Sequence, residues 1–163
     1  MIRLLREEWG SIYEPETLDP GEEGMVVIHH AASPHLPAGT ALSAEIAAIQ
    51  NIERFHVHDR GWQAIGYNWL ITLNGHVFEG RGWAFKGAHA GEVNGKSIGI
   101  CFVMDGQNND LTPAAIEACQ ELIAQGIKLG EVSPTFEMVG HRDVKSTTCP
   151  GMKIYPRLED LRP

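Results

Sequence analysis

The stretch "GMVVIHH", residues 24–30, decides the fold, because an uninterrupted apolar run leads directly into two histidines. A short continuous run of this kind, without polar alternation, is typical of a strand that is buried in a sheet. We therefore predict a buried strand over residues 25–30. Side chains alternate between the two faces of a strand, so only one of His29 and His30 can face a given ligand.

The residues after this strand predict a helix and then a hairpin. The helix begins at Ser43, which serves as its N-cap, and it carries an apolar side. That side is formed by Ile46, Ile49, Ile52 and Phe55. Residues 65–80 predict a hairpin whose two-residue turn is Asn74-Gly75, because apolar runs flank this turn signal on both sides.

The second half of the chain repeats the alternation of strand and helix. Residues 95–105 predict another buried strand, and a second helix begins at Thr112-Pro113 and ends at Gly130. A last strand is predicted over residues 136–141 and a short helix over residues 155–161. This order indicates an α/β fold, with a mixed central sheet flanked by about three helices. Residues 1–24 read as irregular, and residues 1–163 as a single domain.

Composition and charge exclude several classes of function. The chain has 163 residues and a formal net charge of −8, which argues against nucleic acid and anionic membranes as main partners. No run is long and apolar enough to span a bilayer. The first ten residues, "MIRLLREEWG", lack the apolar core of a secretory signal. We expect synthesis in the cytoplasm without a signal peptide; removal of a signal and another export route are the alternatives.

A second decisive stretch is "GHRDVKSTTCPG", residues 140–151, which holds His141 and Cys149 on a segment with neither helical nor strand periodicity. A loop that brings a histidine and a cysteine together indicates either metal ligation or a nucleophile with its base. Cys101 and Cys119 lie in a predicted strand and a predicted helix, where a cysteine usually acts as a small buried hydrophobe. Three widely spaced cysteines do not form a disulfide framework.

His29, His141 and Cys149 together would give three protein ligands and leave a fourth tetrahedral position open. That arrangement is typical of a catalytic zinc site, whereas structural zinc sites usually have four protein ligands. The sequence also lacks a C-x-x-C pair. We therefore expect one zinc ion in a cleft at the ends of the strands. A metal-free Cys149–His141 nucleophile stays open, and it would require a thiolate of low pKa.

Other aromatic and imidazole side chains are weaker candidates. Trp62 and Trp83 each follow Arg-Gly in a turn-like segment and are expected to line a groove for a sugar. His35 lies in a proline-rich loop and is a candidate for contact with a ligand. His56 and His58, at the end of the first long helix, are expected to be solvated or capping residues.

The same motifs resemble the type 2 N-acetylmuramoyl-L-alanine amidases, a family that includes the peptidoglycan recognition proteins and the amidase endolysins of phages. The resemblance runs from "EEWG" (7–10) to "TCPG" (148–151), through "VVIHH", "DRGWQAIGYNWLITLNGHVFEGRGW", "GAHAGEVNGKSIGICFV" and "GHRDVKSTTCPG". The chain lacks the cysteine pair near the first helix that many animal recognition proteins use as a disulfide. This departure and the absent signal favour a phage or bacterial enzyme.

The resemblance implies roles for individual residues. His29, His141 and Cys149 would bind zinc, and Tyr67 would position or polarise the reacting groups. Thr147 lies at a position that holds lysine or threonine in the family and is expected to be catalytic. His89 would line the cleft and contact the substrate.

The implied activity is zinc-dependent hydrolysis of the amide between N-acetylmuramic acid and L-alanine, with peptidoglycan as the partner and a monomeric chain acting on the bacterial wall. A glycosidase would typically need two carboxylates around the scissile bond, and Glu79 and Asp143 each stand alone in their motifs. Family members that replace the cysteine only bind peptidoglycan. This chain retains Cys149, so an enzyme is expected rather than a sensor.

Overall fold

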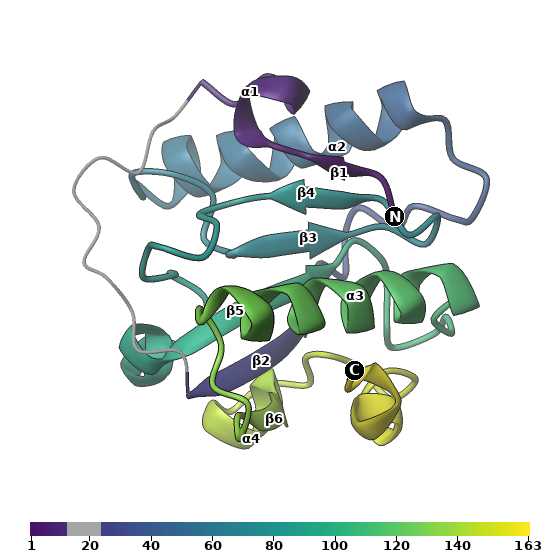
Figure 1. The fold of residues 1–163 in the computed structure, drawn as a ribbon. Coiled ribbons are helices and arrows are strands. Elements are labelled where there is room, and N and C mark those ends of the chain that lie inside the picture. The colour runs from purple at the N-terminus through teal and green to yellow at the C-terminus, as the bar shows by residue number, and fades with distance from the viewer. Residues whose placement is uncertain (13–23) are drawn as a thin grey trace.

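The computed structural model describes residues 1–12 and 24–163 and contains one six-stranded sheet. Its strands lie in the order β1-β4-β3-β5-β2-β6 (Figure 1). Their bounds are β1 Arg3–Leu4, β2 Met25–His30, β3 Trp69–Ile71, β4 Val77–Glu79, β5 Ser97–Phe102 and β6 Glu137–Gly140. Only β3 and β4 are antiparallel among these neighbours, so the expected mixed sheet is confirmed.

β2 is the buried strand that the apolar run predicted. It pairs in parallel with β5 on one side and with β6 on the other. Ile28 lies opposite Gly140 in this register, and His29 lies opposite Cys101. The carboxyl ends of β2 and β6 therefore reach the same edge of the sheet, and the two histidine-bearing motifs meet there.

The helices cover both faces of the sheet. The helical segments are α1 Arg6–Trp9, α2 Leu42–Arg54, a π-helical turn Phe55–Asp59, a 3-10 helix Gly91–Lys96, α3 Pro113–Leu129, α4 His141–Val144 and a 3-10 helix Tyr155–Leu161. α3 lies over one face, and α2 with α1 lies over the other (Figure 1). None of the helices in the described ranges combines the length and apolar composition that a bilayer crossing requires.

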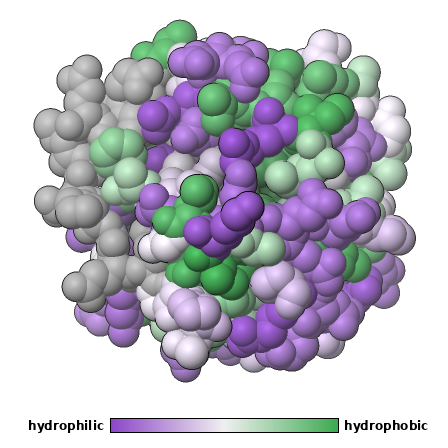
Figure 2. All heavy atoms as spheres, in the orientation of Figure 1, coloured by the Kyte–Doolittle hydropathy of each residue, from purple (hydrophilic) through white to green (hydrophobic). Residues whose placement is uncertain are grey.

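The two faces differ in how the core is filled. Beneath α3, Ile28, Ile100 and Phe102 belong to one large apolar cluster with buried helix residues such as Leu122. Beneath α2, a smaller apolar cluster contains Ile49, Leu70 and Cys101. On the surface seen in Figure 2, hydrophilic residues are spread widely and hydrophobic ones are scattered between them.

Several sequence-based boundaries are confirmed and others need correction. Thr112 caps α3, because its hydroxyl accepts a hydrogen bond from the Ala115 amide at 3.1 Å, and Gly130 ends the helix with a φ of 79°. The Ser43 cap is wrong, because α2 begins at Leu42 and its N-cap, Ala41, has no side-chain hydrogen bond.

The hairpin turn is longer than predicted. Thr72 donates its N–H to the His76 carbonyl at 3.0 Å, so three residues, Leu73 to Gly75, form the loop. Gly75 adopts a φ of 78°, which glycine tolerates without a steric penalty.

The N-terminal expectation was also incomplete. Arg3–Leu4 form β1 and Arg6–Trp9 form α1, where an irregular segment was predicted. β1 is short, and it pairs with β4 rather than with a sequence neighbour. The expectation for residues 13–23 lies outside the described residues.

Candidate metal centre and its cleft

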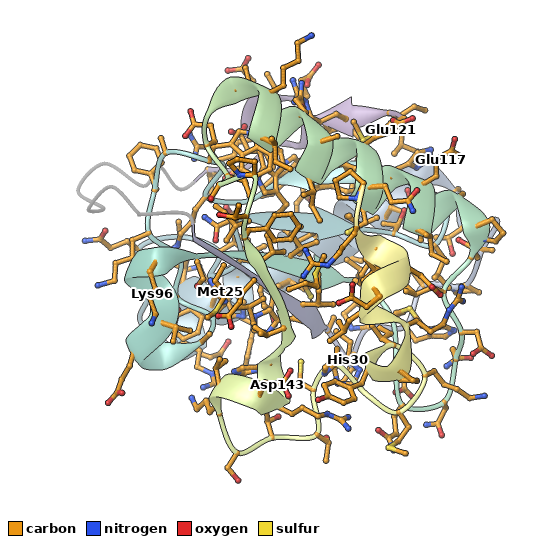
Figure 3. All side chains as sticks on the ribbon, turned by 60° about the horizontal axis from the view of Figure 1, so that its bottom comes forward. Met25, His30, Lys96, Glu117, Glu121 and Asp143 are labelled. Atoms are coloured by element: carbon orange, nitrogen blue, oxygen red, sulfur yellow. The ribbon has the colours of Figure 1, made fainter. Side chains whose placement is uncertain are left out.

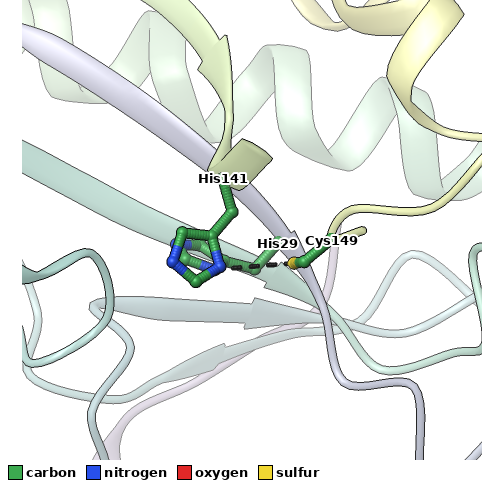
Figure 4. Close-up of side chains that lie close together, drawn as sticks. All are labelled: His29, His141 and Cys149. Carbon is green, nitrogen blue, oxygen red and sulfur yellow. Dashed lines mark hydrogen bonds between the residues drawn. The ribbon is translucent and has the colours of Figure 1, made fainter. Parts of the chain in front are cut away.

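Three side chains from distant parts of the chain meet at the edge of the sheet. His29 comes from the end of β2, His141 is the first residue of α4 after β6, and Cys149 follows on the next loop. One ligand atom from each residue lies within 4.8 Å of the others (Figure 4). The sulfur of Cys149 is 3.8 Å from Nδ1 of His29. The structure thus brings together the three residues that the sequence proposed as metal ligands.

His29 is held by a second imidazole on its other nitrogen. Its Nε2 lies 2.9 Å from Nδ1 of His89, and the two rings meet edge to face. The His89 ring lies against Gly99 of β5, where an added Cβ would approach the ring within 2.5 Å. Sequence reasoning gave His89 a place in the cleft but did not identify it as the partner of His29.

The loop between His141 and Cys149 is closed by local hydrogen bonds. The Arg142 amide donates to the Cys149 carbonyl at 2.9 Å, and the Arg142 guanidinium donates to the Thr148 carbonyl. The same guanidinium lies 4.4 Å from the centre of the Tyr155 ring. The His30 amide also approaches the Cys149 sulfur at 3.4 Å. These contacts fix the direction of the thiol.

His30 and Asp143 have other partners. Nδ1 of His30 accepts a hydrogen bond from the Gly106 amide at 2.9 Å. Asp143 accepts from the Gly140 amide and from the Tyr155 hydroxyl, so it does not orient His141. Figure 3 shows His30 at the end of β2 away from Met25, toward the side where Asp143 of α4 lies.

A cleft of about 450 Å³ opens over the three side chains. Tyr67, Trp62 and His89 line it, as the sequence proposed. The ring centre of Tyr67 is 5.3 Å from that of His29. Further lining comes from residues that sequence reasoning missed or assigned to solvent: His56, Arg60, Asn94 and Lys145.

The expectation for His56 was wrong. Only 8% of its surface is exposed, its Nδ1 accepts from the Gly66 amide, and its ring contacts Trp62 and Tyr67. A sequence signal was available, because His56 lies four residues after Ile52 and one residue after Phe55 at the end of an amphipathic helix. The π-helical turn after α2 directs it inward.

Burial keeps the imidazoles of the site neutral. It lowers the pKa of His29 well below the usual value, and the neighbouring His89 and His141 lower it further. Burial lowers the pKa of His89 to about 3 and also lowers that of His141. Neutral imidazole is the form that binds a metal.

The thiol and the phenol are protonated in the metal-free chain. Burial raises the pKa of Cys149 to about 11. It also raises the pKa of Tyr67 well above its usual value, and the neighbouring Cys101 and Cys149 raise it further. Tyr67 is therefore a neutral hydrogen-bond donor at the wall of the cleft.

Three predicted residues do not line this cleft. Trp83 packs on Trp69, with ring centres 4.9 Å apart, and contacts the apolar cluster beneath α3. Nδ1 of His35 accepts from the Asp105 amide at 3.3 Å, in an exposed loop. Thr147 is exposed, and its hydroxyl accepts from the Cys149 amide at 3.2 Å. Trp83 is therefore partly buried against the apolar cluster, and Thr147 supports the Cys149 backbone.

The donor set and its surroundings fit a zinc ion. Two neutral imidazoles and one cysteine are ligands that zinc prefers, and three protein ligands leave one position open. Among the described residues, Nε2 of His141 is a buried nitrogen without a hydrogen-bond partner. A metal ion would also favour the Cys149 thiolate, which burial alone disfavours.

Known proteins resemble this chain over most of its length. Residues 21–152 match the family model described as N-acetylmuramoyl-L-alanine amidase. Peptidoglycan-recognition protein SC2 of Drosophila melanogaster is 43% identical over 129 residues, which cover 79% of this chain and 68% of that protein. Peptidoglycan recognition protein 1 of Bos indicus is 38% identical over 153 residues, covering 92% and 78%.

Solved structures show the same fold. Drosophila PGRP-LB superposes with a TM-score of 0.90 at 31% identity, over 96% of this chain and 92% of that one. A chain from the complex of tracheal cytotoxin with the PGRP-LCa and PGRP-LCx ectodomains superposes with a TM-score of 0.91 at 32% identity, covering 98% and 95%.

Proposed function

This chain belongs to the N-acetylmuramoyl-L-alanine amidase family, which its peptidoglycan-recognition relatives share, and we propose that it is a zinc-dependent amidase. The bond cut is the amide between the lactyl group of N-acetylmuramic acid and L-alanine in peptidoglycan. The observation that carries the proposal is the convergence of His29, His141 and Cys149 within 4.8 Å. The relatives are named for recognition, so the amidase activity rests on this ligand set.

His29, His141 and Cys149 would hold the zinc. Bound there, zinc would act as a Lewis acid toward the amide carbonyl and the attacking water. Nδ1 of His29 is the nitrogen near the Cys149 sulfur, so a metal bound there would leave the proton on Nε2, which would then donate to Nδ1 of His89. The contacts of Arg142 keep Cys149 close to both imidazoles.

Tyr67 is placed to act on the substrate. Its neutral hydroxyl lies at the cleft wall beside His29. In the attack on an amide, negative charge develops on the carbonyl oxygen, and a donor aimed at that oxygen stabilises the transition state.

Two alternatives predict different chemistry. A metal-free thiol hydrolase needs a low-pKa thiolate, whereas burial raises the pKa of Cys149 to about 11. A recognition protein without catalysis would need neither Cys149 nor the contact between the imidazoles of His29 and His89. The complete ligand set with its supporting His89 favours hydrolysis.

Digestion of purified cell walls tests the proposal. New amines are labelled and identified, and the zinc content of the freshly purified chain is measured by elemental analysis. We expect about one zinc per chain, L-alanine as the new N-terminus, uncut glycan strands, and loss of cleavage in chelator with recovery on adding zinc.

Other outcomes would overturn it in distinct ways. New D-amino or diamino-acid termini would make the chain an endopeptidase, and new reducing ends would make it a glycosidase. Full activity in chelator would favour the thiol hydrolase. Binding of wall fragments with no cleavage in the zinc-loaded chain would favour a recognition protein.

A further inference from the structure

The turn that follows Cys149 packs against a loop from another part of the chain. This loop comprises residues 105–107, lies just beyond β5 and is here called the Gly106 loop. The Lys153 amide donates to the Gly106 carbonyl at 2.9 Å. A backbone hydrogen bond thus joins the loop to the segment that carries the thiol, although the two are distant in the sequence.

The packing between the Gly106 loop and this turn leaves no room for a side chain. A Cβ added to Gly106 would lie 2.3 Å from the Pro150 carbonyl oxygen, and one added to Gly151 would lie 2.2 Å from the Gly106 carbonyl carbon. All three residues are buried. Because the two backbones are in direct contact in a close-packed interior, a movement of the loop would displace the turn.

The side chain of His30 anchors the Gly106 loop to the sheet. Nδ1 of His30 accepts a hydrogen bond from the Gly106 amide at 2.9 Å, and His30 is the last residue of β2. Because β2 lies between β5 and β6, this anchor belongs to the interior of the sheet. Gly106 therefore connects a central strand with the turn after Cys149.

Hydrogen bonds within the segment hold the Gly106 loop in one conformation. The Asp105 carboxylate accepts from the Gln107 amide at 2.9 Å and from Nδ2 of Asn108 at 2.7 Å. An aspartate that bonds to the backbone two residues on stabilises a tight turn. A shift at the Gly106 amide would therefore reach the turn after Cys149 and would not be absorbed within the loop.

We propose that His30 is a positioning residue for Cys149 and acts through the Gly106 loop. Its neighbour His29 belongs to the candidate ligand cluster, whereas His30 holds the sulfur of that cluster in place. The consequence for metal binding rests on the proposed function, since it takes the three side chains as zinc ligands. The His30 amide, 3.4 Å from the Cys149 sulfur, is part of the backbone, so replacing the ring tests the ring alone.

The metal-free chain provides the first test. The reaction of Cys149 with a small thiol reagent is timed in chelator, and the modified residue is identified by mass spectrometry, because Cys101 and Cys119 are also thiols. His30→Ala should raise the rate about fivefold, the effect of losing one hydrogen bond that keeps the turn closed. His30→Asn places an acceptor oxygen near the position of Nδ1 and should restore most of the wild-type rate.

Metal binding provides the second test. Zinc affinity is measured by competition with a chromophoric chelator, and cobalt(II) is used as a spectroscopic substitute whose thiolate charge-transfer band reports on the sulfur ligand. We expect His30→Ala to bind zinc about tenfold more weakly and to show a weaker band, because the partners of metal ligands support affinity to this degree. His30→Asn should recover both properties.

His35→Ala is the matched control. Nδ1 of the exposed His35 accepts from the Asp105 amide at 3.3 Å, so this variant also removes an imidazole and a hydrogen bond from the Gly106 loop. That bond is longer, and it ends on Asp105 rather than on the residue that packs against the turn. The thiol rate and the zinc affinity of His35→Ala should match those of the wild type. Thermal unfolding of both alanine variants without metal checks that they fold.

Equal thiol rates in the wild type and His30→Ala, or the same increase in His35→Ala, would overturn the positioning role. A faster thiol in His30→Ala alone, in a chain that binds no zinc, would support this role and overturn the zinc-dependent amidase. Equal thiol rates with intact zinc binding and wall cleavage would do the reverse. Gly106→Ala keeps His30 but presses on the turn, and a wild-type thiol rate in this folded variant would also contradict the proposal.

Discussion

The two faces of the sheet use neighbouring residues of the same strands for opposite purposes. Toward α3, Ile28, Ile100 and Phe102 are fully buried in the large apolar cluster. Toward α2, His29 and Cys101 are also buried, but His29 belongs to the candidate ligand cluster and its ring lies beside that of Tyr67. Buried imidazoles and thiols add little hydrophobic free energy. Much of the free energy of unfolding should therefore come from the face beneath α3, here called the apolar face, and the face with the ligand cluster is called the polar face. Substitutions on the apolar face should therefore lower the free energy of unfolding, whereas substitutions in the ligand cluster should lower zinc binding and cleavage.

The largest effect is expected from Cys149→Ser. Losing the thiolate should remove the metal and with it several kcal/mol of transition-state stabilisation, which is about 10³-fold in rate or more. Cys149 lies on a loop, so the thermal unfolding of the metal-free variant should match that of the metal-free wild type. Zinc content, wall lysis and unfolding are measured together. Cys119→Ala, on the α3 face, is the control and should keep zinc and activity; unfolding of Cys149→Ser at room temperature would contradict the separation.

Leu122→Ala tests the other face. Leu122 is fully buried beneath α3, so truncation should cost about 2–5 kcal/mol of unfolding free energy. Zinc stoichiometry and activity per folded molecule should stay at wild-type values, because the ligands lie across the sheet. Urea denaturation and an activity assay below the transition check this. A loss of zinc in folded Leu122→Ala would show that the two faces are coupled.

Tyr67→Phe separates chemistry from metal binding within the cleft. Removing one donor aimed at developing charge typically costs about 10²–10³-fold in rate. Zinc content should be unchanged, because the hydroxyl is not a ligand in the His29, His141 and Cys149 cluster. Wild-type cleavage rates in this variant would reduce Tyr67 to a packing residue.

His89→Ala tests the support of His29. Loss of the acceptor for His29 Nε2–H should weaken zinc binding about 10–100-fold, as is typical for removing a partner of a metal ligand. His89→Gln, which can still accept a hydrogen bond, should recover part of the affinity. Competition with a chromophoric chelator measures both. Equal zinc affinity in all three chains would leave His89 a substrate contact only.

The smallest effect is a pH dependence on the polar face. Burial lowers the pKa of His56 to about 4, whereas the unfolded chain should titrate near its ordinary value of about 6.5. The unfolded state therefore binds the proton first, and stability is complete above pH 6.5 and falls as the pH drops toward 4. His56→Gln should reduce this loss by about 1–2 kcal/mol between pH 7 and 4.5. Urea titrations in chelator measure it, and an unchanged pH slope would contradict the buried neutral imidazole.

Sequence patterns captured the apolar face better than the polar one. Strand β2 and helix α3 were predictable, because continuous apolar runs, a Thr-Pro start and a terminal glycine are local signals. β1 was missed, because two residues carry no periodicity and pair with a distant strand. Trp83 lies in a turn-like segment that suggested a groove, but it packs on Trp69 and the apolar cluster beneath α3.

The three candidate ligands could be predicted, because histidine and cysteine at strand ends and in a loop are chemically unusual. The side chains that hold these ligands in place could not be predicted. The contact between His29 and His89 joins residues 60 apart and depends on the bare backbone of Gly99. The place of Arg60 in the cleft was missed because the cleft is lined by segments that are far apart in the sequence.

The parallel register between β2 and β6 also links the candidate metal site to correct strand pairing during folding. Ile28 opposite Gly140 brings His29 level with His141, and a slip of one residue would turn the side chain at that level to the other face. A chain with shifted strands could bury a similar amount of apolar surface. It would keep His141 and Cys149 close to each other on their local segment, but His29 would no longer join them. After refolding, the fraction of chains that bind zinc tightly should therefore count the molecules whose strands have paired correctly.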